Sequence, residues 1–212
     1  MTTLLPPAIE QNLYKTHQQV FDKADLSKHN IWQQVFYLIP FSDVAVTAPK
    51  IVVYADFLSY INDKNHLILS YFIEKIPDNH LDTITKHKRA DFLWQENCLE
   101  CFIEYNERDA YFESNVALDG RYNLYHFDDY RTPNSLPPRW ADSSDIDIWL
   151  IKNSAIVDDF YAYHVCLDSH KTATITKLNP TVILYQNKIP IFYANCHANP
   201  PDFHNKAYWQ TL

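Results

Sequence analysis

Two neighbouring segments of the sequence place carboxylates where they could act together. The segment from Cys98 to Tyr105 alternates like a β-strand, with apolar residues on one face and Glu100 on the other. The next strand-like segment, from Ala110 to Leu118, brings Glu113 and Asn115 to the same side by the same alternation. A third strand adds a tyrosine, so this face carries Glu100, Glu113, Asn115 and Tyr125.

A sheet face of this composition suits a polyhydroxylated ligand. Planar rings stack on the C–H faces of a sugar, and carboxylates and amides accept or donate hydrogen bonds to hydroxyl groups. The alternative is a solvated outer face whose polar residues pair across the strands. Periodicity by itself leaves both interpretations open.

Three other kinds of chemistry can be considered from the same residues. Glu100 and Glu113 could form the acid pair of a glycoside hydrolase, although any two acids on neighbouring strands meet that condition. The Cys98-x-x-Cys101 spacing has no second pair to complete a zinc site, and residues three apart in a strand point to opposite faces. We therefore expect structural thiols and no metal. Met1 is the single methionine, so a haem group would depend on two histidine ligands.

Composition excludes several classes of protein. One glycine in 212 residues leaves no glycine-rich loop for a dinucleotide or ATP, and no G-x-S-x-G elbow for a nucleophilic serine. The net charge of −8 and the lack of a basic segment disfavour nucleic acids and anionic membranes. The first ten residues do not form a secretory signal, so we expect reduced cysteines and a cytoplasmic location. We also expect no cofactor, since the glycine-rich loops that bind nucleotides are missing.

The elements that must position these residues are mostly strands. We expect a helix within 9–24 and a long exposed loop over 133–144 that carries Trp140. Asp119-Gly120 is the preferred pair for a two-residue type I′ hairpin turn. Strands are expected at 51–60, 66–74, 98–105, 110–118, 122–127, 145–152, 160–167, 181–186 and 189–196. The chain is therefore predicted to be all-β, a single antiparallel β-sandwich domain over 1–212 with few short helices.

Three ordered blocks of sequence resemble a known family. They are RADFLWQENCLECF at 89–102, YFESN at 111–115 with DGRYNLYHFDDYR at 119–131, and FYANCHANPPDFH at 192–204. These blocks are similar to bacterial DOMON-like proteins, which are related to carbohydrate-binding module family 9. The resemblance covers about 47–212 and leaves 20–46 as a candidate insertion. It implies a jelly-roll β-sandwich that binds sugars or haem.

With the resemblance, the polar sheet face becomes the candidate site of a non-catalytic module that binds a small polar ligand, with a sugar favoured. A haem-binding electron-transfer module and a hydrolase using Glu100 and Glu113 are the alternatives. The predicted ligand-binding residues are Trp94, Glu100, Glu113, Asn115, Tyr125, Arg131, Asp202 and His204. Trp94 and Tyr125 are expected to stack on the ligand. A structural network is the competing interpretation, in which Arg131 pairs with a glutamate and Asp202 and His204 fasten the C-terminal segment.

Overall fold

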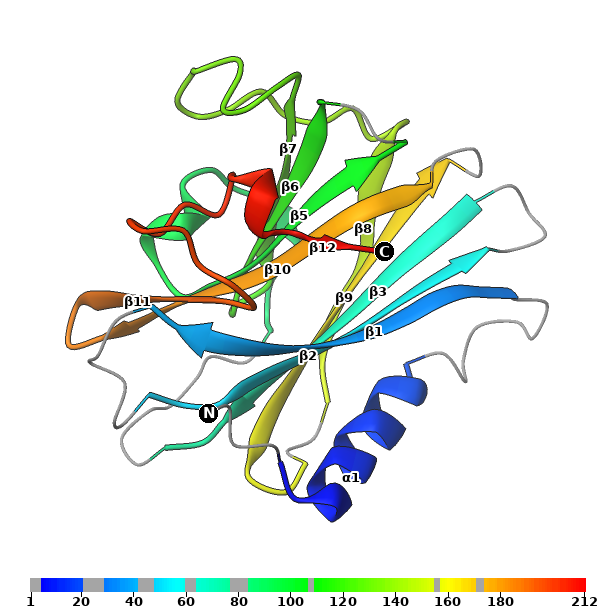
Figure 1. Cartoon of the computed structure of the whole chain (residues 1–212), viewed down its shortest axis with the longest axis vertical. Helices are drawn as coiled ribbons and strands as arrows, with labels where there is room; N and C mark the ends of the chain where they lie inside the picture. Colours follow the sequence, from blue (N-terminus) through cyan, green and yellow to red (C-terminus); the bar gives the residue numbers. More distant parts are fainter. Residues whose placement is uncertain are drawn as a thin grey trace.

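The computed structural model describes residues 5–20, 29–41, 48–59, 64–76, 84–106, 109–154, 157–170 and 174–212, apart from the side chains of 29, 30 and 170. Strands dominate this part of the chain, as the sequence predicts (Figure 1). They are β1 His29–Pro40, β2 Ile51–Ser59, β3 Lys64–Glu74, β4 Lys88–Arg89, β5 Cys98–Tyr105, β6 Tyr111–Ala117, β7 Arg121–Phe127, β8 Ile146–Asn153, β9 Phe160–His170, β10 Ile175–Gln186, β11 Ile189–Ala194 and β12 Gln210–Thr211. The helical elements are α1 Pro7–Gln18 and the short 3₁₀ turns η2 Leu93–Gln95 and η3 Lys206–Tyr208.

The described strands form one strongly curled sheet. Its order is β4-β7-β6-β5-β10-β11-β1-β2-β3-β9-β8, with β12 added alongside β10. Every pairing is antiparallel except that of β4 with β7, which is parallel, so the expectation of a purely antiparallel sheet is corrected. In this pair Lys88 lies opposite Arg121 and Arg89 opposite Tyr122, so β4 runs in the same direction as β7 before the chain enters η2.

The two halves of the sheet meet over one main core. Among the described residues, β1 joins β11 through two residue pairs, Ile39↔Ala194 and Pro40↔Tyr193. The core nevertheless contains residues of both halves, among them Val53 of β2, Leu69 of β3, Leu99 of β5 and Val182 of β10. The Tyr71 hydroxyl of β3 also donates to the Glu100 carbonyl of β5 at 2.7 Å, although these strands are far apart in the sheet order. The curl therefore brings the two halves face to face.

The helix α1 packs on the other face of β2, β3 and β9. Pro7 occupies its first turn, where a missing N–H costs nothing, and Lys15 and His17 lie in its last turn. Leu13 packs in a second apolar cluster with Tyr54 and Phe72. Both faces of β2 and β3 are thus covered.

The buried His17 of α1 begins a chain of hydrogen bonds across this packed surface. His17 Nδ1 lies 2.7 Å from Ser70 Oγ, which lies 2.7 Å from His164 Nδ1. His164 Nε2 lies 2.7 Å from Ser154 Oγ, and His17 Nε2 lies 3.3 Å from Asp56 Oδ2. The chain links the helix to strands β2, β3 and β9.

The single glycine ends β6 in a turn that differs from the predicted type I′. Gly120 N donates to Ala117 O at 2.9 Å, and Gly120 is the residue of this turn with a positive φ, +93°. The geometry is that of a three-residue connection, a type I turn followed by glycine. A Cβ at Gly120 would lie 2.1 Å from Lys86 O, which explains why glycine is required. Positive φ at two central residues occurs instead at Asn187 and Lys188, between β10 and β11.

The candidate insertion over 20–46 contains a central strand. Within it, β1 lies between β11 and β2 and connects the halves of the sheet. The residues 21–28 and 42–47 lie outside the described residues.

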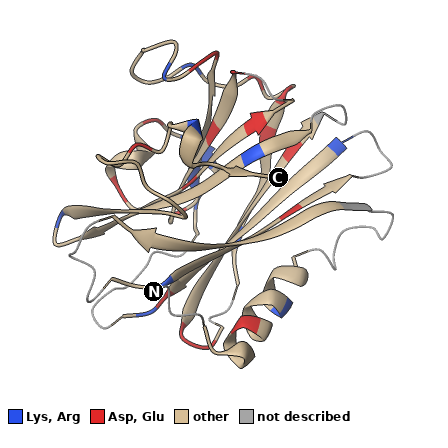
Figure 2. Ribbon diagram, in the orientation of Figure 1, with Lys and Arg blue, Asp and Glu red and all other residues tan. Residues whose placement is uncertain are grey.

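Lys, Arg, Asp and Glu are scattered over the described ribbon with both signs in each half (Figure 2).

Candidate functional site

A cavity of about 250 Å³ lies over the face of β5 and β6 that points away from the main core. The loop that follows β7 and the C-terminal segment around Phe203 cover this face, and the C-terminal segment is drawn in red in Figure 1. The lining residues are Trp94, Glu100, Phe102, Glu113, Phe127, Arg131, Pro133, Asn134, Ser135, Leu136, Pro138, Ile183, Phe192, Pro201, Asp202, Phe203 and His204. The face assignment from sequence is confirmed, since Leu99, Cys101 and Ile103 lie in the main core.

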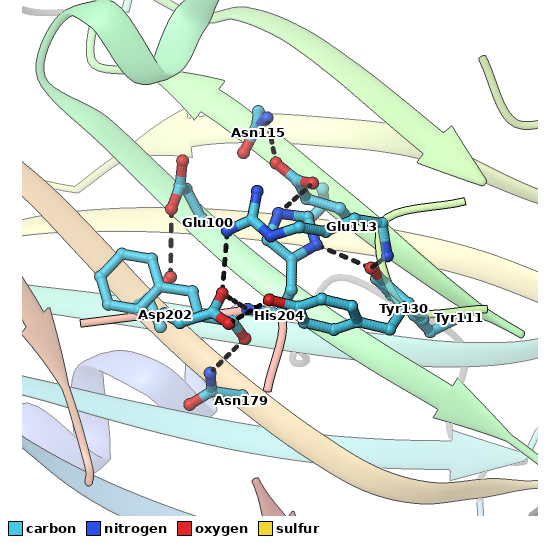
Figure 3. A network of polar contacts seen from close by, with 12 residues as sticks. Glu100, Tyr111, Glu113, Asn115, Tyr130, Asn179, Asp202 and His204 are labelled. Atoms are coloured by element: carbon cyan, nitrogen blue, oxygen red, sulfur yellow. Dashed lines mark hydrogen bonds and ion pairs between the residues drawn. The ribbon is translucent and has the colours of Figure 1, made fainter. Parts of the chain in front are cut away.

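Two buried carboxyl groups form the floor of the cavity. Glu100 is 2% exposed and Glu113 is 5% exposed. Thr181 Oγ1 donates to Glu100 Oε2 at 3.2 Å, and Asn115 Nδ2 donates to Glu113 Oε1 at 2.8 Å (Figure 3). In the β5–β6 register Glu100 lies opposite Asn115, so Glu113 is its diagonal neighbour. Diagonal neighbours in a sheet are about 7–8 Å apart, which is within electrostatic reach.

Burial and mutual repulsion keep this pair protonated to higher pH than free carboxyl groups. Burial, and then the nearby charge of Glu113, raise the pKa of Glu100 well above its usual value. Burial also raises the pKa of Glu113 to about 7, against the opposing effects of the Asn115 hydrogen bond and Arg131. Near neutral pH the cavity therefore offers hydroxyl donors as well as oxygen acceptors.

A polar clasp at the rim fastens the C-terminal segment to the loop after β7. Asp202 accepts hydrogen bonds from the Tyr130 hydroxyl at 2.6 Å and from Arg131 Nη2 at 2.8 Å. It also accepts from the backbone N–H of His204 at 3.2 Å. Burial alone would raise the pKa of Asp202, but the hydrogen bonds from Tyr130 and Arg131 outweigh it and the net shift is downward. The partner of Arg131 is thus Asp202, whereas the competing structural interpretation had paired it with a glutamate.

His204 connects this clasp to the floor. Its Nδ1 atom lies 2.7 Å from the Tyr111 hydroxyl, and its Nε2 atom lies 3.7 Å from Glu113 Oε2. Burial, and then the charge of Arg131, lower the pKa of His204 to about 3, so the ring is neutral at physiological pH. Both ring nitrogens face protein groups, and an axial bond to haem would have to displace one of these contacts.

Aromatic rings supply the apolar walls. Phe102 packs against Phe203 at 6.3 Å and Trp209 at 5.8 Å between ring centroids. Trp94 packs edge-on against Tyr125 at 5.8 Å. A small polar floor within apolar walls is the usual composition of a small-molecule site.

The structure brings together most of the residues singled out from sequence. Those that line the cavity are Trp94, Glu100, Glu113, Arg131, Asp202 and His204. Asn115 lies behind the floor, where it holds Glu113, and Tyr125 lies behind the wall with its hydroxyl donating to Asp91 at 3.0 Å. Neither is among the described residues that line the cavity. Whether these side chains bind a ligand is still a prediction.

Several lining residues were missed. Phe102 and Phe127 follow the same alternation as Glu100, so the face on which they lie could be predicted. The sequence did not show whether a ring on this face lines a cavity or packs in a core. Phe203 and the loop residues 133–138 reach the site only through the docking of distant segments. The 133–144 loop does carry the exposed Trp140, whose Nε1 donates to Asp91 at 2.8 Å.

The cysteines of the C-x-x-C spacing lie on opposite faces of β5, as predicted. Cys101 belongs to the main core and Cys98 packs beside Ile183 in another apolar cluster. Burial raises the pKa of both thiols. Among the described residues, no group of three or more His, Cys, Asp or Glu side chains is arranged to hold a metal ion.

Comparison with known proteins adds a similarity of fold. No family model matches the sequence, and none of the curated proteins matches it significantly. The crystal structure of a "putative carbohydrate-binding protein" from Bacteroides uniformis superposes with a TM-score of 0.53 at 13% identity, over 86% of this chain and 85% of that chain. At this identity the similarity shows the fold alone. In the described part of the chain, no helix has the length and apolar character to cross a membrane.

Proposed function

We propose that this protein is a non-catalytic binding module whose ligand is a sugar or a similar small polyhydroxylated molecule. The observation that carries the proposal is the cavity over β5 and β6, where two buried carboxyl groups lie within aromatic walls. The fold similarity to the Bacteroides protein supports it. On the three sequence blocks at 89–102, 111–131 and 192–204, we propose that the curled sheet is a variant of the DOMON-like β-sandwich related to carbohydrate-binding module family 9.

The division of work follows from the contacts. Trp94 presents its ring to the cavity and stacks on the apolar face of the sugar. Glu100 and Glu113 exchange hydrogen bonds with sugar hydroxyls, and Arg131 donates from the rim. Each such hydrogen bond contributes about 0.5–1.5 kcal/mol, so a ligand with three or four of them binds with modest affinity.

A calorimetric titration with a panel of monosaccharides and disaccharides tests the proposal. Trp94→Ala is compared with Trp149→Ala, because Trp149 is 44% exposed on β8 and packs edge-on against His66, away from the cavity. Loss of one stacked ring weakens binding by roughly two- to tenfold. Trp149→Ala should leave the affinity unchanged. If no sugar binds to a folded wild-type protein, or if both variants lose affinity equally, the proposal is wrong.

Hydrolysis of a glycoside is the second candidate, and one observation favours it. Coupled carboxyl groups that retain a proton near neutral pH can supply an acid and a carboxylate. A panel of nitrophenyl glycosides distinguishes the two candidates. We expect binding without release of nitrophenol, and turnover that disappears in Glu113→Gln would replace the binding module with an enzyme.

A further inference from the structure

Glu100, Glu104 and Glu113 share one face of the sheet, and Glu104 is the one that binds cations among the described residues. Glu104, four residues after Glu100 on β5, accepts a hydrogen bond from Lys206 Nζ at 2.8 Å and lies 3.7 Å from Lys177 Nζ. Thr176 Oγ1 also donates to it at 3.0 Å. Burial alone would raise the pKa of Glu104, but these contacts lower it below the usual value. The charge of Glu104 is therefore neutralised within the protein.

Glu100 and Glu113 have no such partner among the described residues. Their hydrogen-bond donors are the uncharged Thr181 and Asn115. Glu100 Oε1 accepts no hydrogen bond from any described residue, although the side chain is 98% buried and lines the cavity. Asn115 Oδ1, in the residue directly opposite Glu100, is buried and has no hydrogen-bond partner in the described part of the chain.

The charged groups around Glu100 and Glu113 do not include, among the described residues, a cation that is bound to either carboxyl group. The titratable groups that interact with Glu113 are Glu100 and Cys98 from β5, Tyr111 from β6, Tyr125 from β7, Arg131 from the loop and His204 from the C-terminal segment. Arg131 is the one permanent cation of this set, and it is bound to Asp202. His204 is neutral at physiological pH. Among the described residues, the floor is thus a pair of buried carboxyl groups to which no cation is bound.

We propose that the sugar bound here carries a protonated amine, which lies between the carboxyl groups of Glu100 and Glu113, donates to Glu100 Oε1 and pairs with the charge of an ionised Glu113. This inference rests on the proposed function and narrows it from sugars in general to amino sugars. An ammonium group has three donors and no acceptor, which matches a floor made of carboxyl oxygens. Aromatic rings at Phe102 and Phe203 add walls that tolerate a cation.

Three probes separate the charge of the ligand from its shape. Glucosamine carries the amine, glucose has a hydroxyl in its place, and N-acetylglucosamine has an uncharged amide. At about pH 6, where glucosamine is protonated, we expect calorimetry to show glucosamine binding roughly ten- to hundredfold more tightly than glucose. Glu113 is mostly protonated at that pH, so binding of the ammonium should release close to one proton per complex. Titrations in two buffers with different enthalpies of ionisation measure this release, and glucose should release none.

Two variants complete the test. Glu113→Gln keeps the hydrogen bond with Asn115 but cannot ionise, so the preference for glucosamine and the proton release should both be lost. Glu104→Gln removes a carboxylate from the same face without touching the pair, and the preference should persist. Equal binding of glucose and glucosamine to wild type, or a preference retained in Glu113→Gln, overturns the amino-sugar inference and leaves the sugar-binding proposal standing. If none of the three probes and no other sugar binds, the proposed function itself is wrong.

Discussion

Replacing Ser70 with alanine removes the centre of the hydrogen-bonded chain beneath α1. One arrangement of protons satisfies each hydrogen bond in it: Ser154 donates to His164, His164 to Ser70, and Ser70 to His17, whose Nε2 atom lies 3.3 Å from Asp56 Oδ2. Burial, and then the charge of Lys152, lower the pKa of His164 to about 3, in agreement with its neutral form in this arrangement. The Ser70 hydroxyl is therefore both a donor and an acceptor between two buried rings.

Ser70→Ala leaves a buried donor on His164 and a buried acceptor on His17 without this partner. Each unsatisfied buried polar group costs about 1–3 kcal/mol, so the variant should lose about 2–6 kcal/mol of unfolding free energy. For a chain of this size the melting temperature falls by about 2–4 °C per kcal/mol, which gives a decrease of at least about 4 °C.

Urea unfolding and thermal melts measure the loss, with Ser114→Ala as the matched control. Ser114 is also buried, but its hydroxyl makes a single long hydrogen bond of 3.4 Å to Cys101 O. Its removal should cost less than about 1 kcal/mol. A Ser70→Ala protein that melts within about 1 °C of Ser114→Ala would refute the assignment, because the histidines would then not depend on the hydroxyl.

Three further predictions concern other parts of the molecule. Gly120→Ala should lower the unfolding free energy by about 1–3 kcal/mol in urea titrations, because its φ of +93° is strained for alanine and the new Cβ meets Lys86 O; an unchanged midpoint would contradict this. Asp202→Asn weakens a half-exposed ion pair, so stability should change by less than about 1 kcal/mol, but amide hydrogen exchange over 203–209 should accelerate; unaltered exchange would argue against the clasp. The third prediction concerns pH. Folding raises the pKa of Glu113 to about 7, so protonation of this carboxyl group adds stability as the pH falls from about 7 to 4.5. Folding lowers the pKa values of His164 and His204 to about 3, so these two rings remove stability as the pH falls below about 6.5. Glu113→Gln should therefore lose about 1–3 kcal/mol more than wild type between pH 6.5 and 4.5 in urea unfolding, and equal losses would refute these shifts.

The part of the fold that the sequence predicts best is the strand with one apolar face. β5 is an example, because Leu99, Cys101 and Ile103 meet the main core while Glu100 faces the cavity. Alternation of this kind follows directly from the geometry of a pleated strand.

Strands that are covered on both faces lose this signal. In β1, Phe36 and Leu38 belong to the main core, while Val35 and Tyr37 pack with the cluster beneath α1. The resulting run of apolar residues does not alternate, and the strand was not identified. The turn at Gly120 was placed correctly but given the wrong type, since the Asp-Gly preference does not fix the register of the flanking strands.

The residues that form the floor of the candidate site could be predicted from the sequence, whereas the segments that cover it could not. Glu100 and Glu113 could be assigned to one face because they lie on consecutive strands of a hairpin. The positions of Phe203 and the 133–138 loop depend on tertiary docking, about which local periodicity carries no information.

The segments that form the cavity are synthesised at different times. β5 and β6 precede β10, which pairs with the other edge of β5, and they precede Phe203 by about a hundred residues. At about 5–20 residues per second, the ribosome needs roughly 5–20 s to supply both. Until Phe203 is made, it cannot pack against Phe102 or Phe127, which it covers in the folded chain. The yield of folded protein should therefore depend on how fast this stretch is translated.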